Sequence, residues 1–184
     1  DSLLVESTAT NAADAPDLVL YRNSPSPANS DDLGIIRFRG KNNGADTGFG
    51  ENKVIYADIE AEITSVVSGS EGGSLKLYTQ NNGSLASRIT ITGDKVGIGT
   101  DAPEKDLTIE SATSPALGLY STYADTNARN WAINTNNATY GDFTIATSAA
   151  RLGDPTAIKM TILKDGKVGI GTTAPWTRFT VSGG

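Results

Sequence analysis

Apolar and polar residues alternate along much of this chain with the two-residue period of a β-strand. The longest example is the segment Val54–Val67. Within it, every second residue from Ile55 to Ile63 is apolar, whereas the residues between them are mostly acidic. Because successive side chains of a strand point to opposite faces, this pattern predicts a strand with one apolar and one charged face.

Shorter alternating segments occupy most of the remaining sequence, and each predicts a strand of about 5–7 residues, the usual length. No segment shows the 3.6-residue period of a helix, and Pro16 favours a loop for Thr8–Leu20. We therefore expect an all-β fold. The predicted strands lie within 17–23, 33–43, 73–80, 88–100, 116–122, 128–137, 141–148 and 159–172. Tight turns are predicted at Asn43-Gly44, Asn82-Gly83, Gly93-Asp94 and Asp165-Gly166.

The sequence KVGIGT occurs twice, at Lys95–Thr100 and at Lys167–Thr172. The same spacing of 72 residues separates Pro103 from Pro175, so the flanking segments match as well. An internal repeat of this kind predicts β-modules in tandem. The expected boundaries are 1–7 for the end of a preceding repeat, 8–111 for a first repeat with an extra strand inserted at about 44–74, and 112–184 for a second repeat.

The glycines of KVGIGT need a physical reason, because glycine within a strand costs about 0.5–1 kcal/mol relative to alanine. Glycine is tolerated in a strand where another backbone approaches closely. Small modules with few aromatic residues also bury little apolar area alone, and association of identical chains is a common remedy. We therefore predict a homo-oligomer whose copies meet around a common axis at Val96, Gly97, Ile98, Gly99, Val168, Gly169, Ile170 and Gly171.

The 184-residue chain contains no histidine and no cysteine. This composition excludes serine–histidine triads, cysteine nucleophiles, disulfides, and metal sites built on imidazole or thiolate. The formal net charge of −6 argues against a nucleic-acid partner. No apolar run approaches the roughly 20 residues of a membrane-spanning helix, so membrane insertion is not expected. The chain begins with Asp1 rather than methionine, and we expect it to be a piece of a longer protein.

Carboxylates are the remaining candidates for acid–base chemistry. A glycosidase needs two of them about 5–10 Å apart across a cleft, and neighbours on one strand face do not form a cleft. We interpret them as a solvated face that discourages edge pairing, and we predict no catalytic site, cofactor or bound metal. For the second group below, a cation site on the oligomer axis is an alternative, which Lys105 weakens. The groups are Asp58, Glu60 and Glu62, and Asp101, Glu104 and Asp106.

Aromatic side chains could contact a receptor. Trp131 is followed two positions later by Ile133, which predicts that Trp131 faces the core. Trp176 has Glu104 as its counterpart in the first repeat, so the scaffold itself does not require an aromatic residue there. Trp176, Tyr123 and Tyr140 are the candidates for receptor contact. Contact with a following module is the alternative for Trp176, and ordinary loop composition is the alternative for the tyrosines.

Two segments carry a resemblance to a known family, namely RITITGDKVGIGTDAPEKDLTIES and MTILKDGKVGIGTTAPWTRFTVSG. They resemble the VGIGT-P repeats of phage tail-fibre and tail-spike shafts, as found upstream of self-cleaving intramolecular chaperone domains. The stretch Val54–Ile91 also resembles structural proteins of tailed phages. Together the resemblance covers 33–111 and 116–183. No chaperone entry sequence follows Gly184, which leaves open whether such a domain has been cleaved off.

The resemblance implies an elongated homotrimeric fibre of tandem β-modules, with intertwined short strands in β-helix-like or β-prism-like segments. It also implies a structural, non-enzymatic role on the virion in attachment to a host. The implied partners are further copies of the chain, other virion tail proteins, and a host-surface glycan or protein. The alternative is a bacterial surface adhesin or a secreted β-rich carbohydrate-binding module. A polysaccharide depolymerase fragment is a more distant alternative.

Overall fold

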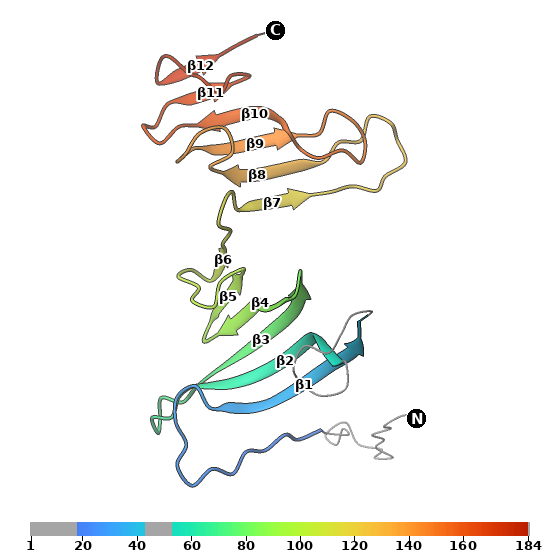
Figure 1. The fold of residues 1–184 in the computed structure, drawn as a ribbon. Coiled ribbons are helices and arrows are strands. Elements are labelled where there is room, and N and C mark those ends of the chain that lie inside the picture. Colours follow the sequence, from blue (N-terminus) through green and yellow to red (C-terminus); the bar gives the residue numbers. More distant parts are fainter. Residues whose placement is uncertain (1–17, 43–52, 184) are drawn as a thin grey trace, which may run out of the picture. The chain divides into compact units, whose positions relative to one another are not determined.

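A computed structural model describes residues 18–42 and 53–183 of the chain. Within these residues every regular element is a β-strand, so the all-β expectation is confirmed. The strands form two open sheets, in each of which neighbouring strands follow the order of the sequence (Figure 1). The chain divides into two compact units, Asp1–Thr108 and Ile109–Gly184.

The first sheet has six strands in the described part of the chain, and they lie side by side in sequence order (Figure 1). Its longest strand, β2, confirms the strand expected within Val54–Val67. The turn between the third and fourth strands has positive φ at Asn82 (48°) and Gly83 (80°), as the Asn-Gly dipeptide predicted. The strands are β1 (Asp32–Lys41), β2 (Lys53–Ser65), β3 (Gly72–Asn81), β4 (Ser84–Thr92), β5 (Lys95–Ile98) and β6 (Leu107–Ile109).

The second sheet repeats this arrangement, again with six described strands in sequence order. Each pair of neighbours among its first five strands is antiparallel, and the fifth strand pairs with the sixth in parallel. Since both sheets have the same strand order, the inserted segment of the first repeat supplies the strand β2, which occupies the position of β8. The strands are β7 (Ala116–Leu119), β8 (Trp131–Thr135), β9 (Phe143–Thr147), β10 (Ala157–Ile162), β11 (Val168–Ile170) and β12 (Phe179–Val181).

One predicted strand is wrong. The described residues of the segment 17–23 form no strand, and β1 is the first strand of this sheet, in the position that β7 has in the second. Side-chain contacts hold this segment against the start of β1 instead. Leu20 packs where a Cβ on Gly34 would lie, and the Arg22 guanidinium donates to the Asp32 carbonyl oxygen at 3.0 Å and to the Asp31 carboxylate at 3.1 Å. The predicted turn Asn43-Gly44 and the predicted repeat end at 1–7 lie outside the described residues.

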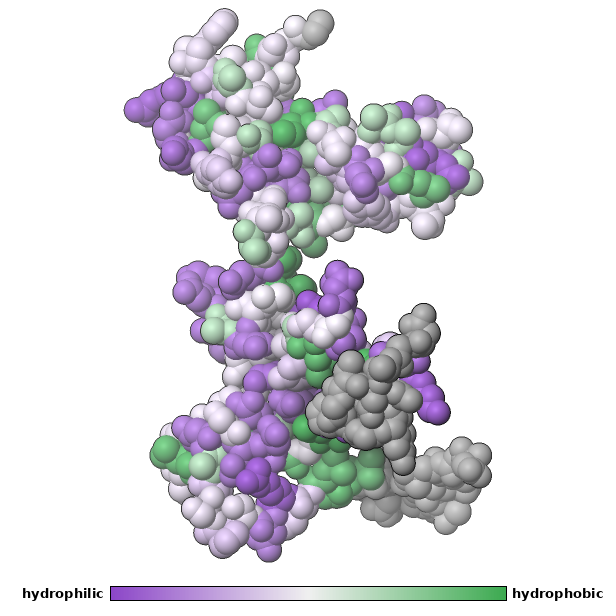
Figure 2. Space-filling view, viewed as in Figure 1, coloured by the Kyte–Doolittle hydropathy of each residue, from purple (hydrophilic) through white to green (hydrophobic). Residues whose placement is uncertain are grey.

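The core of each unit is unusual, because large apolar side chains are not the buried ones. Among the described residues, the buried hydrophobic side chains are those of Ala132 and Ala146 alone. The remaining buried side chains are small or polar, including Thr90, Thr144 and Thr161, none of which is exposed at all. Figure 2 shows apolar side chains at the surface of both units. The chain by itself therefore buries one side of each sheet and leaves the apolar side uncovered.

Candidate functional site: the open apolar faces

Each sheet has an open apolar face, which we define by strand register. In the first sheet, Ile59 of β2 lies between Ile36 of β1 and Leu77 of β3, and Leu77 lies beside Ile89 of β4. Ile89 in turn lies beside Ile98 of β5. Leu77 and Ile89 are half-buried, and the more exposed apolar side chains of this face are 37% to 51% exposed. They include Ile36, Phe38, Ile59, Leu75, Ile91 and Ile98.

The second sheet presents a face of the same kind. Leu117 of β7 lies beside Ile133 of β8, and Ile133 lies beside Ile145 of β9. The pattern continues through Met160 of β10 to Ile170 of β11. Exposed apolar side chains on this face are 38% to 63% accessible, and they include Leu117, Leu119, Trp131, Ile133, Phe179 and Val181.

The environment of Trp131 differs in one respect from the sequence prediction. Trp131 and Ile133 alternate with the buried residue Ala132, so the two side chains share a face as predicted. That face is not a core in the single chain, because Trp131 is 43% exposed. The two-residue period identified the apolar side of β8, but it could not show that nothing in the same chain covers it.

The opposite face of the first sheet is charged. Arg37 of β1 lies directly across from Asp58 of β2, and its Nε and terminal nitrogen donate to the carboxylate at 2.9 to 3.1 Å. The Asp58 side chain is only 2% exposed, whereas that of Arg37 is 33% exposed. The hydrogen bond to Asp58 raises the pKa of Arg37. This bidentate pair satisfies the most buried charge of the sheet.

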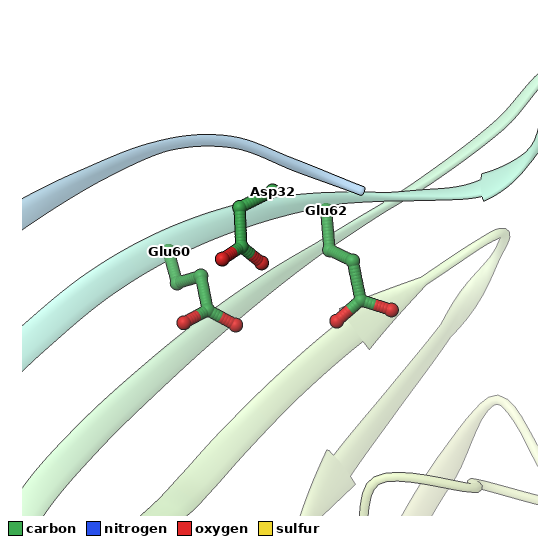
Figure 3. A group of neighbouring side chains, drawn as sticks. All are labelled: Asp32, Glu60 and Glu62. Atoms are coloured by element: carbon green, nitrogen blue, oxygen red, sulfur yellow. The ribbon is translucent and has the colours of Figure 1, made fainter. Parts of the chain in front are cut away.

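Three carboxylates of this face lie close together. Oxygen atoms of Asp32, Glu60 and Glu62 are within 4.8 Å of one another, on β1 and β2 (Figure 3). Such a group has the ligand type of a cation site, but two of its members already have donors. Lys76 Nζ lies 2.6 Å from the Glu62 carboxylate, and the Tyr78 hydroxyl donates to Glu60 at 3.0 Å. The cluster is therefore part of a hydrogen-bonded charge network.

Both donors of this network have perturbed pKa values. The hydrogen bond to Glu62 raises the pKa of Lys76. Burial, followed by the hydrogen bond to Glu60, raises the pKa of Tyr78. Lys76 therefore stays positively charged and Tyr78 neutral near neutral pH. Glu60 and Glu62 share a face of β2 as predicted, but this face is not the solvated one that was expected, because Asp58 is buried and both glutamates are half-buried.

The KVGIGT segments form β5 and β11 with the loops that follow them. A Cβ on Gly97 would collide with the carbonyl oxygen of Thr100, and a Cβ on Gly169 would collide with that of Thr172. Both glycines are buried, as are Pro103 and Pro175. The close backbone that was expected at these glycines therefore belongs to the same chain, whose loop folds back over the strand.

The apolar members of the two segments have a different environment. Val96 and Ile98 lie beside Ile91 and Ile89 on the open apolar face. Val168 and Ile170 lie beside Ile162 and Met160 on the corresponding face of the second sheet. Gly99 and Gly171 have φ angles of 78° and 71°, which glycine adopts without strain. Packing of these segments around an oligomer axis stays a prediction. The four apolar side chains and the second glycine of each segment are at least partly exposed, whereas the first glycine of each is buried under its own loop.

The loop after β5 is fixed by a carboxylate. Thr90 of β4 pairs with Gly97, and its hydroxyl donates to Asp101 at 2.7 Å. This hydrogen bond is the largest cause of the lowered pKa of Asp101. Within 101–106, Asp101 therefore has a structural partner, while Glu104 and Asp106 are exposed. The sequence analysis did not predict this role of Asp101, because Thr90 is on β4 and the two residues meet only when the loop after β5 is folded.

The three aromatic candidates for receptor contact are all exposed. Tyr140 is 89% exposed, Trp176 is 81% exposed and Tyr123 is 71% exposed. They lie on separate loops of the second unit, after β8, after β11 and after β7 respectively. Their role as receptor contacts stays a prediction, and Tyr140 lines two hollows of the described surface.

No protein-family model and no curated protein matches this sequence. Among the described residues there is no helix that could cross a membrane. The function is therefore argued from the faces and loops described above.

Proposed function

We propose that this chain is a structural segment of a homotrimeric viral tail fibre or similar virion appendage that takes part in host attachment. In this proposal, copies of the chain bury the open apolar faces against one another. The trimer, the virion location and the partners rest on the resemblance of the VGIGT-P repeats to phage fibre shafts. The association itself is supported by the geometry of the two sheets.

The observation that carries the proposal is that, in both sheets, large apolar side chains are more exposed than the small and polar ones. Large apolar side chains are partly exposed on one face, while threonine, alanine and asparagine side chains and the Asp58 carboxylate are buried on the other. Contiguous apolar patches of this kind mark interaction surfaces in soluble proteins. Because burial of apolar area contributes about 25 cal/mol per Å², covering two such faces would supply the stabilisation that each unit lacks alone.

A repeated face favours association with identical copies. Both sheets carry their apolar residues on equivalent strands, so parallel copies would match each face with the same face of a neighbour. Closed symmetry then covers every copy equally. Three copies also present each loop three times, and weak contacts to a host surface combine into tight attachment. Such a role requires no catalytic residues, in agreement with the absence of histidine and cysteine.

Light scattering of the purified chain tests the proposal. We expect a particle mass of three chains, each of 19.1 kDa, that persists on dilution into the micromolar range. Ile91→Asp places a carboxylate on the open face and should shift the mass towards that of one chain. Ser84→Asp, at an exposed position of the same strand, is the control and should leave the mass unchanged. A folded, monodisperse monomer of the unmodified chain would overturn the proposal.

A further inference from the structure

We infer that Tyr140 and the hollows beside it form a binding site for a neutral oligosaccharide. The inference extends the attachment role proposed above and does not depend on the number of chains in the oligomer. It rests on three features of the second unit, namely an exposed ring, a braced loop that carries it, and two hollows that this ring lines.

The loop between β8 and β9 is braced by one buried carboxylate. Asp142 is 2% exposed, and its carboxylate accepts hydrogen bonds from the backbone N–H groups of Asn137, Ala138 and Thr139 at 2.9, 2.9 and 3.0 Å. Three such bonds fix the backbone on the N-terminal side of Tyr140. The backbone that carries the side chain at the tip of this loop is therefore fixed before any ligand arrives.

The other side of the loop is closed by Asn136. Its backbone N–H donates to the Asp142 carbonyl oxygen at 3.1 Å, and its side-chain oxygen accepts from the Gly141 N–H at 2.7 Å. Gly141 has a φ of 87°, and a Cβ there would crowd the Lys164 side chain. The turn thus requires glycine after Tyr140. All of these contacts lie within the chain, and none of them uses the Tyr140 ring.

The ring itself is the most exposed of the large apolar and aromatic side chains in the described structure, at 89%. Thr139 and Tyr140 line two hollows, one of about 520 Å³ and the other of about 410 Å³. The larger hollow is lined by short hydroxyl and amide side chains, and the smaller by Leu163, Lys164 and Asp165. The lining of the larger hollow includes Thr113, Ser114, Asn136 and Asn137.

This combination suits a sugar better than an apolar or an anionic ligand. A pyranose has one face of C–H groups, which packs on an aromatic ring, and a rim of hydroxyl groups, which pair with amide and hydroxyl side chains. Lys164 and Asp165 carry opposite charges and both line the smaller hollow, where Asp165 forms an ion pair with Lys167 at 3.0 Å. The net charge of −6 also disfavours an acidic glycan. The fit is therefore to a neutral chain long enough to contact the Tyr140 ring and the two hollows that it lines.

The site stays accessible when the open apolar faces associate. Asn137 Nδ2 donates to the Thr144 hydroxyl at 3.4 Å, so the loop folds over the side of the sheet to which Thr144 belongs. Thr144 alternates along β9 with the side chains of the apolar face and is fully buried. The loop thus lies on the covered side of the second sheet.

Saturation-transfer NMR and calorimetry of the full chain test this inference. The probes are neutral oligosaccharides, namely maltohexaose, cellohexaose, mannohexaose, laminarihexaose and tetra-N-acetylchitotetraose, with polysialic acid as the anionic comparison. We expect saturable binding of at least one neutral probe and none of polysialic acid. Tyr140→Ala should weaken this binding by about tenfold or more, while Tyr140→Phe should stay within about threefold of the unmodified chain because the ring remains.

Tyr123→Ala and Trp176→Ala are the matched controls, since both remove an exposed aromatic side chain of the same unit. They should leave binding unchanged. The inference is overturned if no neutral probe binds, if Tyr140→Ala binds as well as the unmodified chain, or if only a control variant loses binding. Light scattering of Tyr140→Ala should show the mass of the unmodified protein, so loss of sugar binding and loss of association are separate results.

Discussion

The two KVGIGT segments have the same backbone geometry but hold their loops differently. In both, the second glycine of the segment donates its N–H to a carbonyl oxygen at 3.0 Å, that of Arg88 in the first unit and that of Lys159 in the second. In the first unit the loop also receives the Thr90–Asp101 hydrogen bond. In the second, Thr173 takes the position of Asp101, and the buried Thr161 hydroxyl has no partner.

The comparison shows which features the two copies of the motif share and which differ between them. The glycine under the loop and the buried proline are fixed by steric contact with the chain's own backbone. The carboxylate that pins the loop is a local addition, because the second unit has the same loop without it. The covered faces differ in the same way, since the first carries charged pairs and the second carries alanine and threonine.

The largest expected effect comes from filling the space under the loop. Gly97→Ala and Gly169→Ala should each lower the free energy of unfolding of their own unit by about 3 kcal/mol, because the added Cβ meets a carbonyl oxygen that cannot move freely. Hydrogen exchange measured by mass spectrometry assigns the loss to one unit. Gly73→Ala is the control, since its Cβ would make only an ordinary contact at 3.7 Å. Equal effects at positions 73 and 97 would contradict the steric explanation.

A smaller loss is expected when the charged face of the first unit is broken. Asp58→Asn removes the carboxylate that Arg37 contacts and should cost the first unit about 1.5–3 kcal/mol. The second unit, whose covered face has no such pair among the described residues, should not change. Urea unfolding combined with hydrogen exchange measures both units. Asp94→Asn, in an exposed turn, is the control, and a similar loss there would argue against a specific role of the pair.

Replacing Asp101 by threonine, the residue at the equivalent position 173, should make the loop of the first unit resemble that of the second. Asp101→Thr removes the acceptor of the Thr90 hydroxyl and should destabilise the first unit by about 1 kcal/mol. Thr90 keeps its contact with Ser87 at 3.0 Å, which limits the loss. Faster amide exchange confined to β4 and β5 is the expected signature. Unchanged exchange in β4 and β5 would show that the carboxylate does not hold the loop.

The reciprocal substitution in the second unit should stabilise that unit, by less than Asp101→Thr destabilises the first. Thr173→Asp offers the Thr161 hydroxyl the acceptor that it lacks, and we expect a gain of about 0.5–1 kcal/mol in the second unit. The result is read from the urea midpoint and from slower exchange in β10 and β11. Thr173→Asn, which adds an amide of the same size, should give a smaller gain; a loss with aspartate would mean that the two loops are not equivalent.

The smallest expected effect is a difference between the two units in how low pH changes their stability. The hydrogen bond from Thr90 lowers the pKa of Asp101 in the folded state. Its contribution is therefore complete above the unfolded pKa of about 3.9 and is lost as the pH falls through the lower folded value. Exchange in β4 and β5 should accelerate in this window and not in Asp101→Asn. An identical acid response of that variant would assign the effect to other carboxylates.

Much of the fold could be predicted from the local pattern. The two-residue period from Ile55 to Ile63 specified the strand β2 and both of its faces, because strand geometry alternates side chains regardless of what surrounds them. The Asn82-Gly83 turn was also predictable, since positive φ at both positions favours these residues. The expected strand at 17–23 failed, because whether an extended segment joins a ladder depends on its neighbours.

Of the candidate sites, the sequence determined which residues carry apolar, acidic or aromatic side chains, and it determined the repeat that places them equivalently in two units. Only the tertiary structure decided that the KVGIGT glycines lie under their own loops and that the large apolar side chains lie on the uncovered faces. It also decided that Asp142 braces the loop of Tyr140. The physical reason is that periodicity fixes the direction of a side chain, whereas burial and hydrogen bonding depend on segments that are distant in sequence and fold over it.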